Sequence, residues 1–345
     1  MRRRAKPPQW GAALLMALIT VALVATLAAA ALWRQWRGIE VESAERTRVQ
    51  SAWLLTGALD WARLLLLGDL VEDRQHGALV DHLGEPWAVP LAESRLSDFL
   101  SAGQSSGASD LERNAFLSGQ ITDLQSRLNV LNLAAPDADT QAAARARFTR
   151  LFQTLGLPIS QLAALQRGLI CAYAAMYPVT GSGTGSACGN PPLLPQRVEQ
   201  LTWLGLDAAT LTRLAPYIAV LPLPVTGGIV PVNLNTASNV VIYAALPGLQ
   251  AAQAEQLVTL RQSTYFKSVD DAVQRGNLDT ASVNTDWAAV NSSFFEVHGR
   301  LRLDDATLQE IAAVERAILP TQPTPIVFPL WRARSALTSG DLDAP

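Results

Sequence analysis

The chain has 345 residues, enough for two or three domains, and a formal net charge of −3. Hydrophobic residues make up 49% of the chain and charged residues 17%, which is apolar for a soluble protein. Four of the 27 Lys and Arg residues lie in the first six positions, so the remainder is more acidic than the total suggests. This distribution argues against a nucleic-acid-binding body, which usually has a basic face.

Residues 12–32 form an apolar stretch without a charge or a proline. At ~1.5 Å per residue the stretch is long enough to cross a ~30 Å hydrocarbon layer. Four basic residues lie within the first six, and such a cluster should stay cytoplasmic while the rest of the chain crosses the membrane. A cleaved secretory signal is the alternative, because Ala28-Ala29-Ala30 resembles a signal-peptidase site.

The helical pattern continues beyond the apolar stretch. From Trp33 to Leu67 apolar residues recur at helical spacing, and no proline interrupts them. We therefore expect one helix from Ala12 to Leu67, half in lipid and half packed on a globular domain. Two helices broken at Gly38 are the alternative. A signal peptide has no reason to run on into such a helix, so the continuity favours a retained anchor.

The remaining elements alternate between strand and helix patterns. Residues 116–133 alternate well enough to predict a hairpin that turns near Gln125-Ser126. Helices with short loops are expected between residues 142 and 260, and their ranges are 159–176, 195–204, 208–219, 240–246 and 250–261.

After Asn291 the pattern changes to period two. The segments 294–303, 311–319 and 326–334 are expected to form an antiparallel sheet. The order of elements predicts an α+β fold whose sheet is interrupted by a helical insertion. Residues 335–345 look like a disordered tail.

Several segments in this order resemble the general secretion pathway protein K (GspK) family, the large minor pseudopilins of type II secretion systems. The leader that ends in Gly11 looks like a prepilin leader. WLLTGALDWARLLLLGDL and PWAVPLAESRLSDFL resemble the first helix of the family and the segment after it. FLSGQITDLQSRLNVLNL is similar to its hairpin, and NPPLLPQRVEQLTWLGL and VPVNLNTASNVVIYAALPGL resemble parts of its helical insertion.

The resemblance implies processing by prepilin peptidase after Gly11, followed by methylation of Ala12. It also implies a pseudopilin fold with a large all-α insertion of the SAM-like or helix-hairpin-helix-like type. Most pilin-like subunits carry Glu at the fifth mature position, where this chain has Met16, and the family shares that absence. The implied divisions are a leader (1–11), a transmembrane and amphipathic helix (12–67), a first α+β part (68–135), the helical insertion (136–292), the last strands (293–334) and the tail (335–345).

Cys171 and Cys188 are the two cysteines of the chain and can pair in an oxidising compartment. Family members often carry an acid-rich, calcium-binding run at this position, whereas here Gly, Ser and Thr lie between the cysteines. We expect a disulfide in its place, with a contribution of roughly 3 kcal/mol in the chain-entropy model. We expect no cofactor. The alternative is calcium, for which the weak candidates are Asp270, Asp271, Asp279 and Asp286.

Residues 234–261 resemble a helix-hairpin-helix, a motif that binds DNA phosphates in some proteins. No Lys or Arg occurs between Thr236 and Leu260, so a packing module is expected and no nucleic-acid partner. The three histidines, His76, His82 and His298, lack metal-ligand spacing, and no catalytic constellation is present. No enzyme is therefore expected.

The sequence thus predicts a minor pseudopilin anchored in the bacterial inner membrane, with its N-terminus cytoplasmic and its body periplasmic. The resemblance implies a role at the tip of the pseudopilus, where the subunit starts and caps assembly for export of folded proteins. The implied partners are the minor pseudopilins I and J, the major pseudopilin and prepilin peptidase. The alternatives are a type IV pilus-like tip component, a signal-anchored periplasmic DNA-binding protein and a secreted hydrolase.

Overall fold

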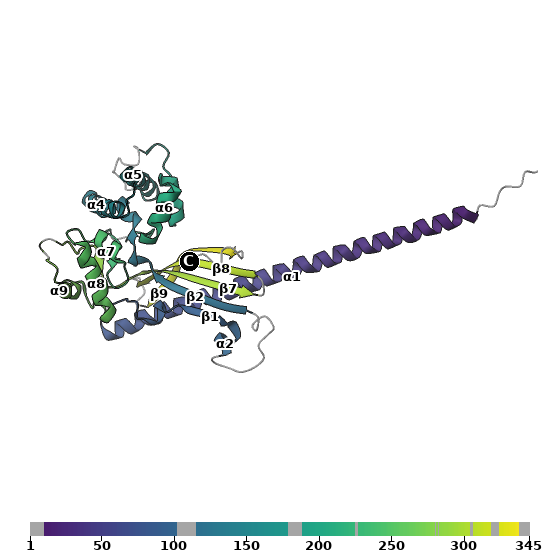
Figure 1. The fold of residues 1–345 in the computed structure, drawn as a ribbon, viewed down its shortest axis with the longest axis horizontal. Coiled ribbons are helices and arrows are strands. Elements are labelled where there is room, and N and C mark those ends of the chain that lie inside the picture. The colour runs from purple at the N-terminus through teal and green to yellow at the C-terminus, as the bar shows by residue number, and fades with distance from the viewer. Residues whose placement is uncertain are drawn as a thin grey trace, which may run out of the picture. The chain divides into compact units, whose positions relative to one another are not determined.

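The computed structural model describes residues 10–101, 115–178, 188–224, 227–279, 281, 283–303, 306–318 and 324–337. These residues form a mixed helix and sheet structure (Figure 1). The chain divides into two units, residues 1–56 and residues 57–345. The first unit contains the N-terminal part of a long helix, and the second contains the rest of that helix together with all other elements.

The long helix, α1, runs without a break from Trp10 to His76. It continues through Gly38, so the two-helix alternative is wrong. It also ends later than the predicted Leu67. The helix continues through Gly68. Leu66 and Leu70 are buried on either side of it, and their packing outweighs the ~1 kcal/mol that glycine costs in a helix.

A five-stranded antiparallel sheet has the order β1-β2-β7-β8-β9. Its strands are β1 (Leu91–Arg95), β2 (Ala115–Asp123), β7 (Phe294–Leu303), β8 (Ala306–Ile318) and β9 (Pro325–Leu337). The short helix α2 (Leu96–Ser101) follows β1. The three C-terminal strands pair as their alternating patterns predicted. Residues 335–337 belong to β9 rather than to the expected tail, and residues 338–345 lie outside the described residues.

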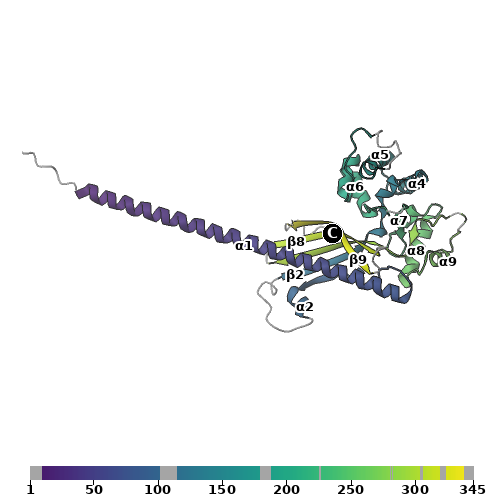
Figure 2. The same cartoon turned by 180° about the vertical axis from the view of Figure 1, so that it is seen from behind.

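One face of the sheet is covered by the C-terminal part of α1 (Figure 2). Leu59, Ala62 and Leu66 lie on the same helix face and pack against a core from the sheet. Phe295 is fully buried in this core, and Trp87 meets it edge to face at 5.1 Å between ring centroids. Because side chains alternate along a strand, the neighbours of these core residues point to the opposite face.

A helical region is inserted between β2 and β7, which are adjacent in the sheet. It contains α4 (Ala138–Thr154), α5 (Ile159–Met176), α6 (Ala208–Leu214), α7 (Asn239–Ala245), α8 (Ala251–Ser263) and α9 (Val269–Arg275). Two short parallel pairs hold it together, β3 (Leu128–Asn129) with β4 (Ile218–Ala219) and β5 (Val232–Asn233) with β6 (Ala288–Ala289). Its core includes Phe148, Leu165, Leu201, Ile242 and Phe266.

The predicted hairpin in residues 116–133 is wrong. β2 pairs with β7 along its length, from Ala115 opposite Leu303 to Asp123 opposite Phe295. The Asp123 side chain then accepts a hydrogen bond of 2.7 Å from the backbone N–H of Gln125, which closes a 3₁₀ turn and directs the chain out of the sheet. β3 pairs with β4 of the helical region instead of returning along β2.

The predicted helices of the insertion are present with some corrections. Residues 198–204 form a 3₁₀ helix, which begins after the predicted start at Pro195. The helix from Ala208 ends at Leu214, because Pro216 removes a backbone donor and lies in the 3₁₀ turn that follows.

Candidate functional site

Within the part of the chain that the structure describes, one helix is long and apolar enough to cross a membrane, and it is the segment of α1 from Gly11 onwards. The most apolar window of this helix buries none of its residues in the protein. Met16, the predicted fifth mature residue, is exposed, as are Gly11 and Ala12. Cleavage after Gly11 and methylation of Ala12 stay predictions, and residues 1–9 of the leader lie outside the described residues.

At its other end, α1 is joined to the body by a buried ion network centred on Arg316 of β8. The Arg316 side chain is 3% exposed. Its Nη1 lies 2.7 Å from Oδ2 of Asp69 on α1, and its Nη2 lies 2.5 Å from Oδ1 of Asp81, just after α1. Nη2 also donates to the carbonyl of Ser292, which precedes β7. One guanidinium therefore holds together three segments that are remote in sequence.

A second layer of buried polar groups extends this network into the helical region. Asp123, at the end of β2, accepts hydrogen bonds from Ser292 Oγ at 2.7 Å and from Asn233 Nδ2 at 3.1 Å. Asn233 lies in β5 and also donates to the backbone carbonyl of Asp81 at 3.1 Å. The backbone N–H of Ser292 donates to Asp81 Oδ2 at 2.7 Å. The network thus fixes the point at which the helical insertion leaves the sheet.

Burial perturbs the acids of this network. It raises the pKa of Asp69 to about 6 and that of Asp123 to about 6. The pKa of Glu85, which accepts a hydrogen bond from Trp87 Nε1, is raised by burial to about 8. Burial lowers the pKa of Arg316, but the carboxylates of Asp81 and Asp69 outweigh this and leave it above its ordinary value. Arg316 stays charged and provides the positive charge of the site.

Carboxylate oxygens of Asp69, Asp81 and Glu85 lie within 4.8 Å of one another, a spacing that can suit a metal ion. Asp69 and Asp81, however, already accept hydrogen bonds from Arg316, whose guanidinium provides the compensating charge. A cation would have to displace it. The donor set therefore fits an arginine rather than calcium.

The predicted calcium candidates do not form such a group within the described residues. Asp270 and Asp271 lie in the first turn of α9, where negative charge is favourable, and Asp271 accepts from the backbone N–H of Lys267. Asp279 accepts from the backbone N–H of Ala281. Asp286 accepts from the side chain of Asn284. These aspartates take part in local turns and caps.

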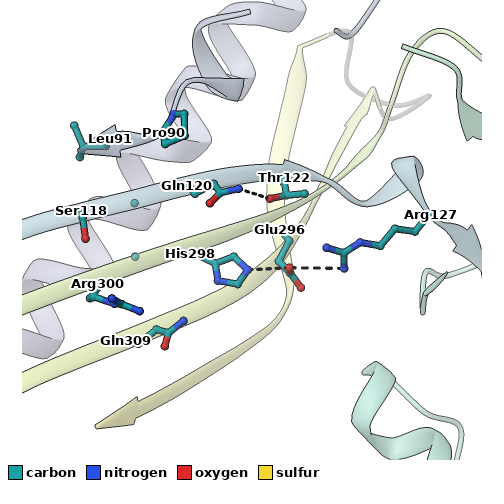
Figure 3. A pocket seen from close by; sticks show the side chains of 12 residues that line it. Pro90, Leu91, Ser118, Gln120, Thr122, Arg127, Glu296, His298, Arg300 and Gln309 are labelled. Atoms are coloured by element: carbon teal, nitrogen blue, oxygen red, sulfur yellow. Dashed lines mark hydrogen bonds and ion pairs between the residues drawn. The ribbon is translucent and has the colours of Figure 1, made fainter. Parts of the chain in front are cut away.

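The sheet face opposite α1 carries a polar groove of about 460 Å³ (Figure 3). Gln120 and Thr122 of β2 and Glu296 and His298 of β7 line it. His298 Nε2 lies 2.8 Å from Glu296 Oε1, and Arg127 lies 4.0 Å from the same oxygen. Burial raises the pKa of Glu296, but these two partners outweigh it and leave the pKa below its ordinary value. Glu296 is thus paired with two cationic or titratable neighbours on this face of the sheet.

A disulfide joins Cys171 and Cys188, with the sulfur atoms 2.02 Å apart and the Cα atoms 5.7 Å apart. Cys171 belongs to α5, and Cys188 precedes the proline-rich segment at Pro191. The bond therefore closes a loop at the C-terminal end of α5. Residues 179–187 of that loop lie outside the described residues.

Two arginines of α4 contact the helix-hairpin-helix, although its own sequence is poor in basic residues. Arg147 Nε donates to the carbonyl of Ala245 at 2.9 Å, and Arg150 Nη2 donates to the carbonyl of Leu249 at 3.0 Å. Arg147 also stacks on Trp287 at 4.1 Å. Since both guanidinium groups donate to backbone carbonyls of the hairpin, this arrangement favours packing over phosphate binding.

Comparison with known proteins agrees with this architecture. Two models described as Type II secretion system (T2SS), protein K, match residues 126–223 and 232–291. The type II secretion system protein K of Pseudomonas aeruginosa is 29% identical over 327 residues, which cover 89% of each chain. That of Klebsiella pneumoniae is 29% identical over 335 residues, which cover 89% of this chain and 93% of the relative. These matches bear out the resemblance to the type II secretion system protein K family.

A solved structure supports the fold. A chain of the GspK-GspI-GspJ complex from the type 2 secretion system of enterotoxigenic Escherichia coli matches with a TM-score of 0.57. The match covers 85% of this chain and 98% of that chain at 16% identity. The matched relatives are type II secretion system components, and the likeness to the solved chain shows the α+β fold.

The ion network around Arg316 was missed at the sequence level. Asp69, Asp81 and Arg316 are isolated in the sequence and share no motif spacing. A signal existed in Arg316, which lies two residues after Val314, beyond Glu315, in a strand that otherwise reads as half-buried. A charge in such a strand requires a partner when it is buried.

Proposed function

We propose that this chain is the minor pseudopilin at the tip of a type II secretion pseudopilus, where it starts and caps filament assembly during export of folded proteins. The observation that carries the proposal is the character of α1. Its first part is apolar and buries nothing, whereas its last part is packed on a sheet and held by Arg316. Such a helix suits a subunit that waits in a membrane and then joins a helical filament core.

The place of the insertion supports the capping role. The helical region leaves the sheet after Asp123, and the network around Asp123 also contains Asp69 and Asp81. These residues lie near the C-terminal end of α1, the end furthest along the helix from its apolar segment. A bulky region there would obstruct a subunit arriving from that side and leave the membrane side free for addition.

Met16 supports the tip position. If the mature chain begins at Ala12, its fifth residue carries no charge. A glutamate at this place in a filament is balanced by a neighbour's amine, and an unbalanced carboxylate in lipid is costly. A subunit with no neighbour above it needs no such glutamate. The partners that suit the position are the minor pseudopilins I and J, which the related Escherichia coli complex contains by its title.

The proposed cellular place is the inner membrane, with the N-terminus cytoplasmic and the body periplasmic. This orientation rests on the basic residues before Gly11. The role is structural, and neither a cofactor nor a reaction is proposed. The major pseudopilin would add to the filament below the tip complex.

N-terminal sequencing of the mature protein, from cells with and without prepilin peptidase, tests the anchor. A start at Ala12 that requires the peptidase is expected, and a start near Ala31 would overturn the proposal. The tip role is tested by deleting the chain and counting pseudopili under overexpression of the major pseudopilin. Restoration by wild-type protein, with fewer filaments in the deletion, is expected. Unchanged initiation would contradict it.

A further inference from the structure

The segment directly after the apolar span of α1 carries two tryptophans and two arginines. The span, residues 12–32, contains no charge, and Trp33, Arg34, Trp36 and Arg37 follow it at once. Helix α1 continues through all four residues, which we call the tryptophan-arginine patch. An apolar span of this length crosses the hydrocarbon layer, so the patch would lie at the level of the polar lipid headgroups.

The patch occupies one side of the helix. At about 100° per residue its side chains cover about 160° of the helix circumference, and Gln35 and Gly38 lie outside this arc. The rings of Trp33 and Trp36 are 5.6 Å apart between centroids, and each residue is 58% exposed. Both arginines are exposed as well. The described part of the protein therefore leaves this side of α1 open.

The two arginines of the patch differ from the arginines that follow on the same helix. Arg46 pairs with Glu42 at 2.9 Å, and Arg48 also pairs with an acid of α1. Among the described residues, neither Arg34 nor Arg37 has a hydrogen bond or an ion pair. Two guanidinium groups without a protein partner thus lie beside two indole rings, immediately after the span.

Both kinds of side chain suit the surface of a phospholipid bilayer. A guanidinium binds phosphate oxygens through two parallel N–H donors. Tryptophan is enriched at both membrane–water interfaces, because its ring is apolar and its N–H can donate a hydrogen bond. Helix α1 also begins with a tryptophan, Trp10, which lies ~34 Å before Trp33 at ~1.5 Å per residue. This distance slightly exceeds the ~30 Å of the hydrocarbon layer.

We propose that Trp33, Arg34, Trp36 and Arg37 form a binding site for phospholipid phosphate groups at the periplasmic surface of the inner membrane. The arginines bind the phosphates, and the two indole rings lie beside the first carbons of the acyl chains. The inference rests on the proposed membrane anchor and specifies its lipid contacts. Because the arginines meet phosphate only at this level, the patch fixes the depth of the helix in the bilayer.

Quenching by brominated lipids tests the position of the two indoles. The chain has nine tryptophans, so the emission of this pair is the difference between the full chain and its Trp33→Phe, Trp36→Phe variant, both reconstituted in phospholipid vesicles. Lipid brominated near the headgroup should quench this difference emission more strongly than lipid brominated near the end of the acyl chain. The reverse order, or no quenching by either lipid, would overturn the proposal.

The headgroup of the quencher tests the arginines. As a minor component, brominated phosphatidylglycerol should be enriched about fivefold around the pair relative to brominated phosphatidylcholine, the factor that ~1 kcal/mol for one arginine at an anionic surface gives. Arg34→Gln together with Arg37→Gln should abolish this enrichment.

Arg46→Gln together with Arg48→Gln is the matched control, because it removes the same charge from the same helix at arginines that already have partners. The control should leave the enrichment unchanged. An equal loss from both pairs of substitutions would indicate a general attraction of positive charge to the anionic lipid and would refute the site.

The lipid site and the proposed function fail separately. If the pair is quenched and phosphatidylglycerol is enriched, but deletion of the chain leaves pseudopilus initiation unchanged, the tip role is wrong and the lipid site stands. If the mature chain begins at Ala12 and the pair is not quenched, the lipid site is wrong and the processed anchor stands.

Discussion

Replacing Arg316 by methionine should be among the most damaging single changes in this protein. Methionine fills similar space but removes every charge-assisted hydrogen bond of the guanidinium. Asp69 and Asp81 would then lie buried without their partner, although their pKa values are already raised by burial in its presence. Breaking a buried ion pair by removing one member costs about 3–5 kcal/mol. That is a large part of the 5–15 kcal/mol by which domains are stable.

The assay is urea unfolding of the full chain in detergent at neutral pH, followed by near-ultraviolet circular dichroism of its aromatic side chains. Arg302→Met is the matched control, because Arg302 pairs with Glu93 on the surface, where both side chains are 40% or more exposed. Such pairs contribute about 0–1 kcal/mol. A loss from Arg316→Met no larger than that from Arg302→Met would refute the idea that the network holds the body together.

Three further changes probe the same structure. Glu85→Gln should raise the free energy of unfolding by an amount that grows from pH 4.5 to pH 8. The folded protein holds the Glu85 proton up to a pKa of about 8. The free energy of unfolding of the wild-type protein therefore falls as the pH rises through this window, by at most ~5 kcal/mol. A gain from Glu85→Gln that does not depend on pH in urea titrations would contradict this reasoning. Cys171→Ser should lower stability by ~2–4 kcal/mol, and dithiothreitol should lower wild-type stability equally but leave the variant unchanged. Asn233→Leu should lower the free energy of unfolding by ~1–3 kcal/mol, because Asp123 and the carbonyl of Asp81 each lose a buried hydrogen-bond donor. Gln274→Leu, at an exposed position, should leave the free energy of unfolding nearly unchanged.

The elements that sequence predicted well are those whose signals are local. Period-two alternation located β7, β8 and β9, and their pairing follows from short connections. Pro158 located the start of α5 because its backbone has no N–H donor and fits the beginning of a helix. The continuity of α1 was read from an uninterrupted apolar pattern.

The pairing of strands that are remote in the sequence could not be predicted from local patterns. The alternation in residues 116–133 fits a hairpin as well as it fits one strand beside a remote partner. β2 pairs with β7, across the whole helical region, and nothing between Asp123 and Phe295 encodes that choice locally. The ion network is hidden for the same reason. Asp69, Asp81 and Arg316 meet only after β2 and β7 have paired.

The buried ion network around Arg316 is better understood as fixing the position of α1 on the sheet than as a source of stability. Buried ion pairs often contribute no more than well-packed apolar residues of similar volume. Hydrophobic contacts of Leu59 and Leu66 could slide by a helical turn at little cost, because neighbouring turns of α1 are similarly apolar. A guanidinium that must reach Asp69, Asp81 and the carbonyl of Ser292 together allows one position. The proposed role, in which the helix would enter a filament core while the body projects from it, would require such a fixed position of the helix on the sheet.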